Sequence, residues 1–289
     1  MTLVRLLRRG RWPLATLLVA VLVGLGVGLA SSTTNDDRAR PAPALVWAIG
    51  DGGTGGKPPK QVAAMVARDR PDRVLYLGDV YETGTAKEFE VNFAGVYGRL
   101  VGRMWPTPGN HEWARHAKGY DRFWRGVRGK RLPHFYANDV GGWRLLSANS
   151  QDPGNPGQLR WLREQVAGAD SDCLIAFWHR PRFNAGRHGD EEAAVAPLWD
   201  AVKGRVPIVL SGHDHNFQRF KPVDGTVQYV SGAGGKERYV VDDADPRLAF
   251  SDDETFGGLR IRLFPGEAEL TFVSADGSTL DTSTVSCGP

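Results

Sequence analysis

The sequence predicts an α/β protein in which two mixed β-sheets pack face to face with helices on their outer sides. Two observations carry this prediction. Strand-like apolar runs alternate with helical patterns from about residue 44 to residue 210, and from Val227 the chain changes to segments in which apolar and polar residues alternate. Strands that alternate with helices and then follow one another suit two sheets sharing one core. The 289 residues, 41% hydrophobic and 24% charged, are enough for a large fold of this kind.

The first forty residues predict a targeting segment. Four arginines precede a run from Trp12 to Ala30 that has no charged residue. As a helix this run would span roughly 28 Å, close to the apolar thickness of a bilayer. The arginines keep the N-terminus inside and send the rest of the chain across. Residues 1–30 are therefore expected to be a signal anchor or a signal peptide. Gly28 and Ala30 favour cleavage, whereas the length of the run favours a retained anchor, which we prefer.

Residues 31–43 have the composition of a flexible linker, so the folded domain is expected over residues 44–289. Six arginines and two aspartates give residues 1–40 a charge of +4, and the whole chain has +3, which leaves 3 − 4 = −1 for residues 41–289. This near-neutral part gives no reason to expect a nucleic-acid partner. We expect an extracytoplasmic domain, held at the cell membrane by the N-terminal helix or secreted if that helix is removed.

The first half of the domain is expected to alternate between strands and helices. The expected elements are a strand at 44–50, a helix through 62–66, a strand at 73–78, a long amphipathic helix from 85 to 100 and a short strand at 104–108. Thr85 and Glu88 have the spacing of a capping box at the start of the long helix.

The second half begins with a hairpin and ends in strands. The expected elements are strands at 135–138 and 143–148, a helix from 155 to 166, a strand at 173–179, a helix at 191–203, and strands at 206–210, 227–230, 259–263 and 267–272. Gly141-Gly142 is a hairpin signal. Asn155 and Asp190 are expected to cap the two helices.

Five short motifs carry metal-binding side chains, and most of them directly follow a predicted strand. They are Gly50-Asp51-Gly52-Gly53, Gly78-Asp79-Val80-Tyr81, Gly109-Asn110-His111-Glu112, Trp178-His179-Arg180 and Gly212-His213-Asp214-His215. Loops at strand ends are where an α/β scaffold gathers distant side chains. Carboxylate, amide and imidazole donors suit two adjacent divalent or trivalent cations, a pair that promotes displacement at phosphorus.

Individual residues in these motifs suggest individual roles. His213 and His215 would project to the same side of an extended segment and reach adjacent cations, while Asp214 would point away and orient a ligand. Asn110 offers an amide oxygen, and His111 would face the substrate from the same turn. Two further histidines, at positions 116 and 134, lie outside the motifs and are expected to be ordinary surface or packing residues.

This ordered set resembles the calcineurin-like metallophosphoesterase superfamily from about Val46 to Phe220. It resembles the purple acid phosphatase branch in detail, because Gly53 stands where the wider superfamily has histidine. The resemblance implies a four-layer α/β/β/α sandwich and two metal ions, which can be Fe, Mn or Zn, including an Fe/Zn or Fe/Mn pair. It also implies roles for eight residues. Asp51, Asp79 and His215 would hold one ion, Asp79, Asn110, His179 and His213 would hold the other, and His111 and His188 would contact phosphate, one of them protonating the leaving oxygen.

The sequence departs from the branch at one ligand. The family's iron-binding tyrosine lies three residues after the second aspartate, where this chain has Glu82, and the tyrosine here is Tyr81. Tyr81 is therefore a ligand only if the loop bulges. If Tyr81 does not bind iron, the protein would lack a ferric–tyrosinate bond and therefore a purple colour.

The expected function is hydrolysis of phosphate monoesters on small-molecule or other ester substrates, by hydroxide formed on the metal ions, outside the cytoplasm. A phosphodiesterase or nucleotide pyrophosphatase on the same scaffold is an alternative. A non-catalytic surface binding protein stabilised by metal ions is another. Outside the cytoplasm, Cys173 and Cys287 can form a disulfide that ties the C-terminal tail to the sheet.

Overall fold

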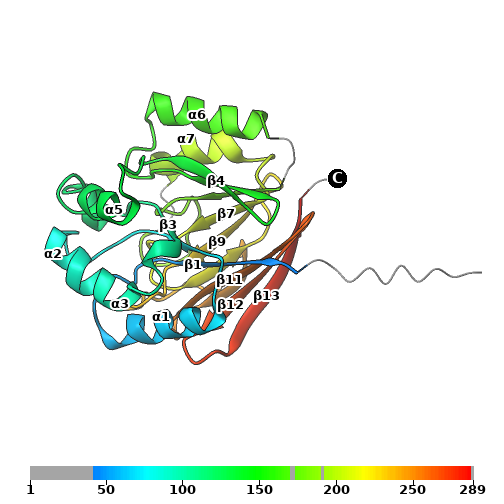
Figure 1. Ribbon diagram of the computed structural model, residues 1–289. Coiled ribbons are helices and arrows are strands. Elements are labelled where there is room, and N and C mark those ends of the chain that lie inside the picture. The colour runs from blue at the N-terminus through cyan, green and yellow to red at the C-terminus, as the bar shows by residue number, and fades with distance from the viewer. Residues whose placement is uncertain (1–41, 170–172, 190–191, 288–289) are drawn as a thin grey trace, which may run out of the picture. The chain divides into compact units, whose positions relative to one another are not determined.

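A computed structural model describes residues 42–169, 173–189 and 192–287. The predicted N-terminal anchor, residues 31–41 of the predicted linker and the predicted cap Asp190 lie outside the described residues. Within the parts of the chain that are described, no helix is both long enough and apolar enough to cross a bilayer. These parts form two mixed sheets with helices outside them, which confirms the predicted α/β class (Figure 1).

The six-stranded sheet contains the first three and the last three strands of the described chain. In spatial order these are β13 (Thr279–Ser286), β12 (Glu267–Ser274), β11 (Gly257–Phe264), β1 (Ala44–Ile49), β2 (Arg73–Tyr76) and β3 (Met104–Pro106). Strands β1, β2 and β3 are parallel to one another, whereas β11 pairs with β1 in the antiparallel sense and places Leu263 opposite Ala44. The chain therefore leaves this sheet after β3 and returns to it at its end.

The seven-stranded sheet is formed by the middle of the chain. In spatial order its strands are β10 (Leu248–Asp252), β8 (Phe217–Phe220), β9 (Val227–Ser231), β7 (Ile208–Ser211), β6 (Leu174–Phe177), β5 (Trp143–Ser147) and β4 (Tyr136–Val140). Strands β5, β6, β7 and β9 are parallel, and the outer pairs are antiparallel. The parallel strands in the two sheets point their carboxyl ends toward the site described below.

Helices cover the outer face of each sheet (Figure 1). The six-stranded sheet is covered by α1 (Lys57–Asp69), by α5 (Tyr120–Arg128) and by a helical segment made of α2 (Ala86–Glu88), a π-helical stretch (Phe89–Ala94) and α3 (Gly95–Tyr97). The seven-stranded sheet is covered by α6 (Pro156–Ala167) and α7 (Glu192–Val202). A short 3₁₀ helix (Val101–Arg103) leads into β3, and α4 (Asn110–Trp113) follows it.

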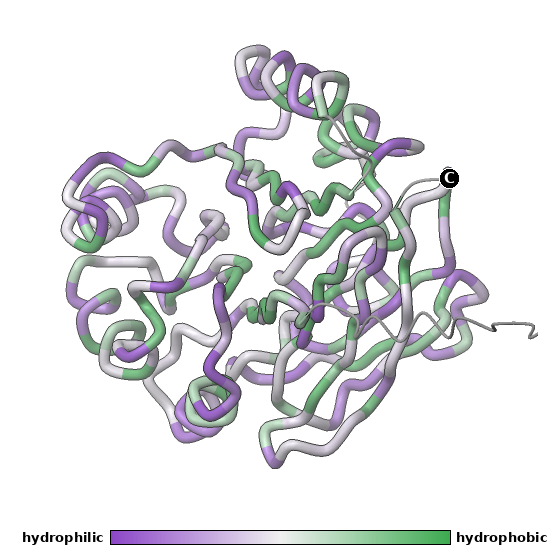
Figure 2. The backbone as a smooth tube through the Cα atoms, turned by 45° about the vertical axis from the view of Figure 1, so that its right-hand side comes forward, coloured by the Kyte–Doolittle hydropathy of each residue, from purple (hydrophilic) through white to green (hydrophobic). Residues whose placement is uncertain are grey.

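The alternation of side chains along the strands produces three apolar layers. Val46 and Ala48 of β1 lie between the two sheets, whereas Trp47 and Ile49 pack beneath the helices of the six-stranded sheet. A third apolar layer separates the seven-stranded sheet from α6 and α7. Figure 2 shows hydrophobic residues recurring along the central strands. Burial on both faces explains why these strands are nearly continuous apolar runs in the sequence.

Local signals set several element boundaries as predicted. Thr85 and Glu88 form the capping box, and Asn155 accepts the Gln158 N–H at 3.0 Å at the start of α6. Gly141 and Gly142 both have positive φ, at 60° and 79°, in the hairpin between β4 and β5. The predicted long helix differs in its middle, because residues 89–94 are π-helical rather than α-helical.

Six elements of the described chain were not predicted: the 3₁₀ helix, α4, α5, β8, β10 and β13. Strand β13 reads Thr-Leu-Asp-Thr-Ser-Thr-Val-Ser and lies at the edge of its sheet. An edge strand with one face toward water needs few apolar residues, so its pattern is too weak to distinguish from a loop.

Candidate metal centre

The predicted donor residues converge at one end of the sandwich, where the parallel strands of both sheets finish. Asp51, Asp79 and Asn110 follow β1, β2 and β3 of the six-stranded sheet. The histidines His179, His213 and His215 follow β6 and β7 of the seven-stranded sheet. All of these except Asn110 are buried. Three donors therefore come from each sheet, and the centre lies where the two sheets meet.

The backbone at three of these donors has a left-handed conformation. Asp51, Asp79 and His213 have φ values of 61°, 71° and 71°, although none is glycine. Such conformations are uncommon for side-chain-bearing residues and typically cost about 1–3 kcal/mol each, and they gather at functional sites. Gly109 is needed for another reason, because a side chain at this position would collide with the Asp79 carboxylate.

The first donor group surrounds His179. Its Nε2 lies 2.9 Å from Asn110 Oδ1, 3.1 Å from His213 Nδ1 and 3.4 Å from Asp79 Oδ1. Donor atoms of Asp79, His179 and His213 all lie within 4.8 Å of one another. His179 Nδ1 bonds the Leu77 carbonyl at 2.7 Å, which leaves Nε2 free to act as a donor to a cation.

The second donor group surrounds the hydroxyl of Tyr81. This hydroxyl lies 3.0 Å from Asp51 Oδ1 and 2.9 Å from His215 Nε2, and these two atoms are 3.7 Å apart. His215 Nδ1 bonds the Glu237 carbonyl, so Nε2 is the nitrogen aimed at the group. The loop after β2 thus brings Tyr81 among the donors despite its shifted position in the motif. The His213 N–H donates to Asp51 Oδ2 at 2.8 Å and links the two groups.

The electrostatics of the two groups favour cations. Burial, and then the neighbouring Asp79 carboxylate, raise the pKa of Asp51 well above its usual value. Burial alone would raise the pKa of Asp79 as well, but the nearby His179 and His111 outweigh it and the pKa is lowered. Burial lowers the pKa of His179 to about 3 and that of His215 to about 4, so both imidazoles are neutral. The neutral imidazoles and the Asp79 carboxylate are in the protonation state that metal ions bind, whereas Asp51, whose raised pKa favours its protonated form, would release a proton when a cation binds.

His111 and His188 lie at the edge of the donor groups, each with a side chain that is 31% exposed. His111 Nδ1 bonds the Glu82 carbonyl at 2.7 Å, and its Nε2 is 3.8 Å from Asp79 Oδ2. His188 stacks on His213 with ring centroids 4.1 Å apart. Its Nδ1 lies 2.9 Å from Oδ1 of the fully buried Asp214.

The predicted geometry of the His213-Asp214-His215 motif was wrong in one respect. The segment is not extended, because His213 has positive φ and the residues form a bend. His213 belongs to the first donor group and His215 to the second, and the carboxylate of Asp214 holds His188. The bend, rather than the alternation of an extended strand, delivers the two imidazoles to neighbouring donor groups.

Two contributors were missed by sequence reasoning. Glu112 is buried and accepts backbone N–H groups from Asp79, Val80 and Gly109 at 3.2, 3.0 and 2.8 Å. Its place in the third motif was the only available signal. Tyr239 stacks on His215 at 4.0 Å and comes from a loop without a recognisable pattern.

The predicted cysteine pair lies away from the donors. Cys173 and Cys287 form a disulfide with Cα atoms 4.8 Å apart. Cys173 directly precedes β6 and Cys287 directly follows β13, so the bond joins one strand of each sheet. Because His179 follows the other end of β6, the disulfide and the donor groups are at opposite ends of that strand.

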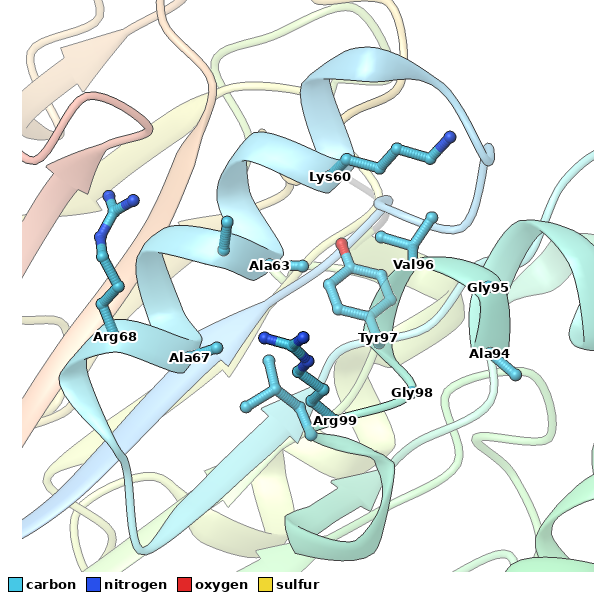
Figure 3. A pocket seen from close by; sticks show the side chains of 12 residues that line it. Lys60, Ala63, Ala67, Arg68, Ala94, Gly95, Val96, Tyr97, Gly98 and Arg99 are labelled. Atoms are coloured by element: carbon cyan, nitrogen blue, oxygen red, sulfur yellow. The ribbon is translucent and has the colours of Figure 1, made fainter.

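A cavity of about 590 Å³ lies elsewhere, between α1 and the helical segment around Tyr97 (Figure 3). Lys60, Arg68 and Arg99 are at its margin, and none of the predicted metal ligands lines it. It is therefore separate from the candidate metal centre.

Comparisons with known proteins agree with the geometry. The family model for calcineurin-like phosphoesterases matches residues 45–217. The chain is 27% identical to tartrate-resistant acid phosphatase type 5 of Sus scrofa, over 93% of this chain and 94% of that protein. It is 25% identical to purple acid phosphatase 21 of Arabidopsis thaliana, over 66% of this chain and 51% of that protein.

Solved structures share the fold at lower identity. The purple acid phosphatase PPD1 from seeds of yellow lupin (Lupinus luteus) superimposes with a TM-score of 0.71 and 18% identity, over 86% of this chain and 55% of that one. GAP50, the anchor in the inner membrane complex of Plasmodium, superimposes with a TM-score of 0.73 and 15% identity, over 86% and 90% of the two chains. At these identities the likeness shows the fold alone.

Proposed function

Because the chain belongs to the calcineurin-like phosphoesterase family, we propose that it hydrolyses phosphate monoesters at a centre of two metal ions. The observation that carries the proposal is the convergence of two donor groups on adjacent positions, each group with donors from the ends of both sheets. The resemblance to the purple acid phosphatase branch is confirmed by the relatives in Sus scrofa and Arabidopsis thaliana. Their activity is the basis for expecting an acid-phosphatase-like hydrolase here.

The residues present fit two cations with mixed oxygen and nitrogen ligands. Asp79, Asn110, His179 and His213 would hold one ion, and Asp51, Tyr81 and His215 would hold the other, with Asp79 shared between them. Fe, Mn and Zn all accept such ligands. When bound, the ions would neutralise phosphate charge and lower the pKa of a water molecule, so that it can attack phosphorus at ordinary pH. Tyr81 adds a phenol to the second group, which favours a ferric ion there.

The chain's own residues would handle the proton on the leaving oxygen. The fully buried Asp214 carboxylate accepts from His188 Nδ1 and fixes the orientation of the ring, which leaves Nε2 as the nitrogen available to a bound phosphate. His111 is held in the corresponding way through Nδ1 by the Glu82 carbonyl. Both rings are partly exposed beside the donor groups, so a phosphate bound there can reach them.

A paired measurement of metal content and turnover tests the proposal. Purified protein should hold two ions per chain and hydrolyse a monoester such as p-nitrophenyl phosphate. Asp79→Asn and His213→Gln should lose both metal and turnover, whereas Asp139→Asn, an exposed carboxylate in β4, should lose neither. A variant that holds no metal and retains full activity would exclude the proposal, and metal-loaded protein without turnover would favour a binding protein.

The same assay separates the two enzymatic alternatives. A panel that includes bis-p-nitrophenyl phosphate and a nucleotide pyrophosphate should show higher kcat/KM for the monoester. A preference for the diester or the pyrophosphate would replace the monoesterase proposal and leave the metal centre intact.

We also propose an extracytoplasmic location. The disulfide between Cys173 and Cys287 supports it, because such bonds persist in oxidising compartments and are rare in the cytosol. Cell fractionation with N-terminal sequencing of the mature protein tests this and decides between anchor and cleaved signal. Recovery of the full-length protein from the cytosol with reduced cysteines would contradict it.

A further inference from the structure

We propose that His116, Asp121 and His134 form a third cation site, suited to Zn²⁺ or a similar divalent transition metal. Asp121 Oδ2 lies 3.1 Å from His116 Nδ1, and Asp121 Oδ1 lies 2.8 Å from His134 Nε2. Donor atoms of all three residues lie within 4.8 Å of one another. The proposal does not rest on the proposed function, because none of these residues belongs to either donor group of the metal centre.

The donor types select the class of cation. Two imidazoles and one carboxylate make a ligand set that Zn²⁺ uses, with a fourth position open to water. Ca²⁺ and Mg²⁺ prefer oxygen ligands and are not expected to bind here. Donors that share a tetrahedral Zn²⁺ at about 2.1 Å are roughly 3.4 Å apart. In the structure each imidazole nitrogen pairs with a different oxygen of Asp121, at 3.1 and 2.8 Å, and one donor atom from each residue lies within 4.8 Å of the other two. Side-chain rotations would therefore have to bring the three donors to this spacing around one cation.

Two of the three ligands are held in place by the backbone of one compact turn. The N–H of His116 bonds the carbonyl of Trp113, and the N–H of Asp121 bonds the carbonyl of His116 at 2.8 Å. Asp121 also lies in the first turn of α5. His134 alone comes from farther along the chain, in the loop that leads to β4. Binding therefore has to order one additional side chain, which keeps its entropic cost small.

Trp113 forms a wall of the site. It stacks on His116 with ring centroids 4.4 Å apart and meets His134 edge-on at 5.1 Å. The side chains of Asp121 and His134 are 10% and 17% exposed, and that of His116 is 33% exposed. The site is thus mostly enclosed and has access to solvent on the His116 side.

A cation at this position would tie together the segment that follows the metal centre. Trp113 ends α4, which begins with Asn110 and His111. The proposed site joins the turn after α4 to the start of α5 and to the loop before β4. Its expected effect is structural: it holds α4 in place without contacting substrate.

Zn²⁺ counting in a background that lacks the metal centre tests the proposal. Asp79→Asn/His213→Gln protein should be loaded with Zn²⁺, desalted and analysed by elemental mass spectrometry. It should retain about one equivalent, and adding His134→Gln should remove it. Gln at position 134 can still donate to Asp121, so loss of Zn²⁺ would report loss of a ligand rather than loss of the hydrogen-bonded cluster.

Co²⁺ supplies a second readout, because its visible bands should indicate four-coordinate nitrogen and oxygen ligation in the same background and should disappear with His134→Gln. His116→Gln, which changes the most exposed of the three ligands, serves as a second variant if His134→Gln fails to fold. Equal Zn²⁺ content with and without these substitutions would overturn the proposal. So would a background variant that folds and binds no Zn²⁺, even if the wild-type protein holds two ions.

Discussion

Replacing Glu112 by glutamine should show how far the metal centre depends on a residue that touches no cation. One carboxylate oxygen of Glu112 accepts from Asp79 and Gly109, and the other accepts from Val80. Glutamine keeps the size of this buried side chain but only one acceptor oxygen. If the amide oxygen takes the place of the oxygen that accepts from Asp79 and Gly109, glutamine keeps two of the three hydrogen bonds. Its NH₂ group then faces the Val80 N–H, which is left without this acceptor.

The magnitude follows from these contacts. A buried N–H without an acceptor costs about 1–3 kcal/mol, and two bonds that lose their charge assistance weaken by about 1 kcal/mol each. Burial and the charge of Asp79 raise the pKa of Glu112 to about 8, so in metal-free protein at pH 7 the side chain is largely protonated and has little charge assistance to lose. With metal bound, the ions compensate the charge of Asp79 and favour the Glu112 carboxylate. We therefore expect a loss of about 2–4 kcal/mol in the free energy of unfolding of metal-loaded protein and a smaller loss in chelator-treated protein.

Chemical denaturation of metal-loaded and chelator-treated protein measures the effect, and metal titration reports the accompanying loss of affinity. Glu90→Gln, the same substitution at an exposed position, is the matched control and should change stability by less than about 0.5 kcal/mol. If Glu112→Gln is as stable as the control and binds metal like the wild type, the positioning role assigned to Glu112 is wrong.

Four further predictions concern the disulfide, pH, the tyrosine and the leaving group. Replacing Cys173 and Cys287 by alanine opens a covalent loop across 114 positions. This should lower the free energy of unfolding by up to about 4–5 kcal/mol and leave the metal content unchanged. An unchanged denaturation midpoint would contradict this prediction. In metal-free protein the pKa of His179 is lowered to about 3, so the stability it contributes is full above pH 6.5 and is lost as the pH falls toward 3. Between pH 6.5 and pH 5, the free energy of unfolding of His179→Gln should therefore fall by about 2 kcal/mol less than that of the wild type. Chemical denaturation in EDTA would detect this difference, and equal falls in the two proteins would disprove it. Tyr81→Phe should abolish any visible charge-transfer band of iron-loaded protein and weaken metal binding, whereas an unchanged spectrum would show that the phenol is not a ligand. His188→Ala should slow esters with poor leaving groups far more than esters with good ones, and equal slowing in a series of substituted phenyl phosphates would exclude proton donation by this residue.

The sequence predicted that the candidate metal ligands lie close together, because most of them lie next to a strong local signal. Asp51 and Asp79 lie within three residues of the ends of mostly buried strands, whose apolar runs are easily recognised. The parallel order of such strands brings their carboxyl ends to one edge, so the convergence of distant motifs follows from the class of fold. The bounds of those strands that were predicted agreed to within a few residues for the same reason.

Contacts between residues with no local pattern could not be predicted. Whether Tyr81 reaches the second donor group depends on the course of one loop. The backbone contacts of Glu112 depend on how α4 packs against the loop after β2. His116 and His134 were expected to be ordinary residues, because nothing in the sequence shows that a turn and a distant loop bring them to opposite oxygens of Asp121. These features arise from tertiary packing, which periodicity and composition do not encode.

The order in which the chain visits its two sheets affects synthesis on the ribosome. Strand β1 pairs with β2 soon after it emerges, but its other neighbour is β11, which places Leu263 opposite Ala44. Until translation passes that point, one edge of a strand that is almost entirely buried in the finished protein stays open. An apolar strand edge with unpaired backbone groups can form hydrogen bonds with other strands, including those of neighbouring nascent chains. In a polypeptide that ends before Gly257, this edge of β1 therefore stays unpaired. We expect such a truncated chain to aggregate or to be degraded rather than to fold as a smaller protein.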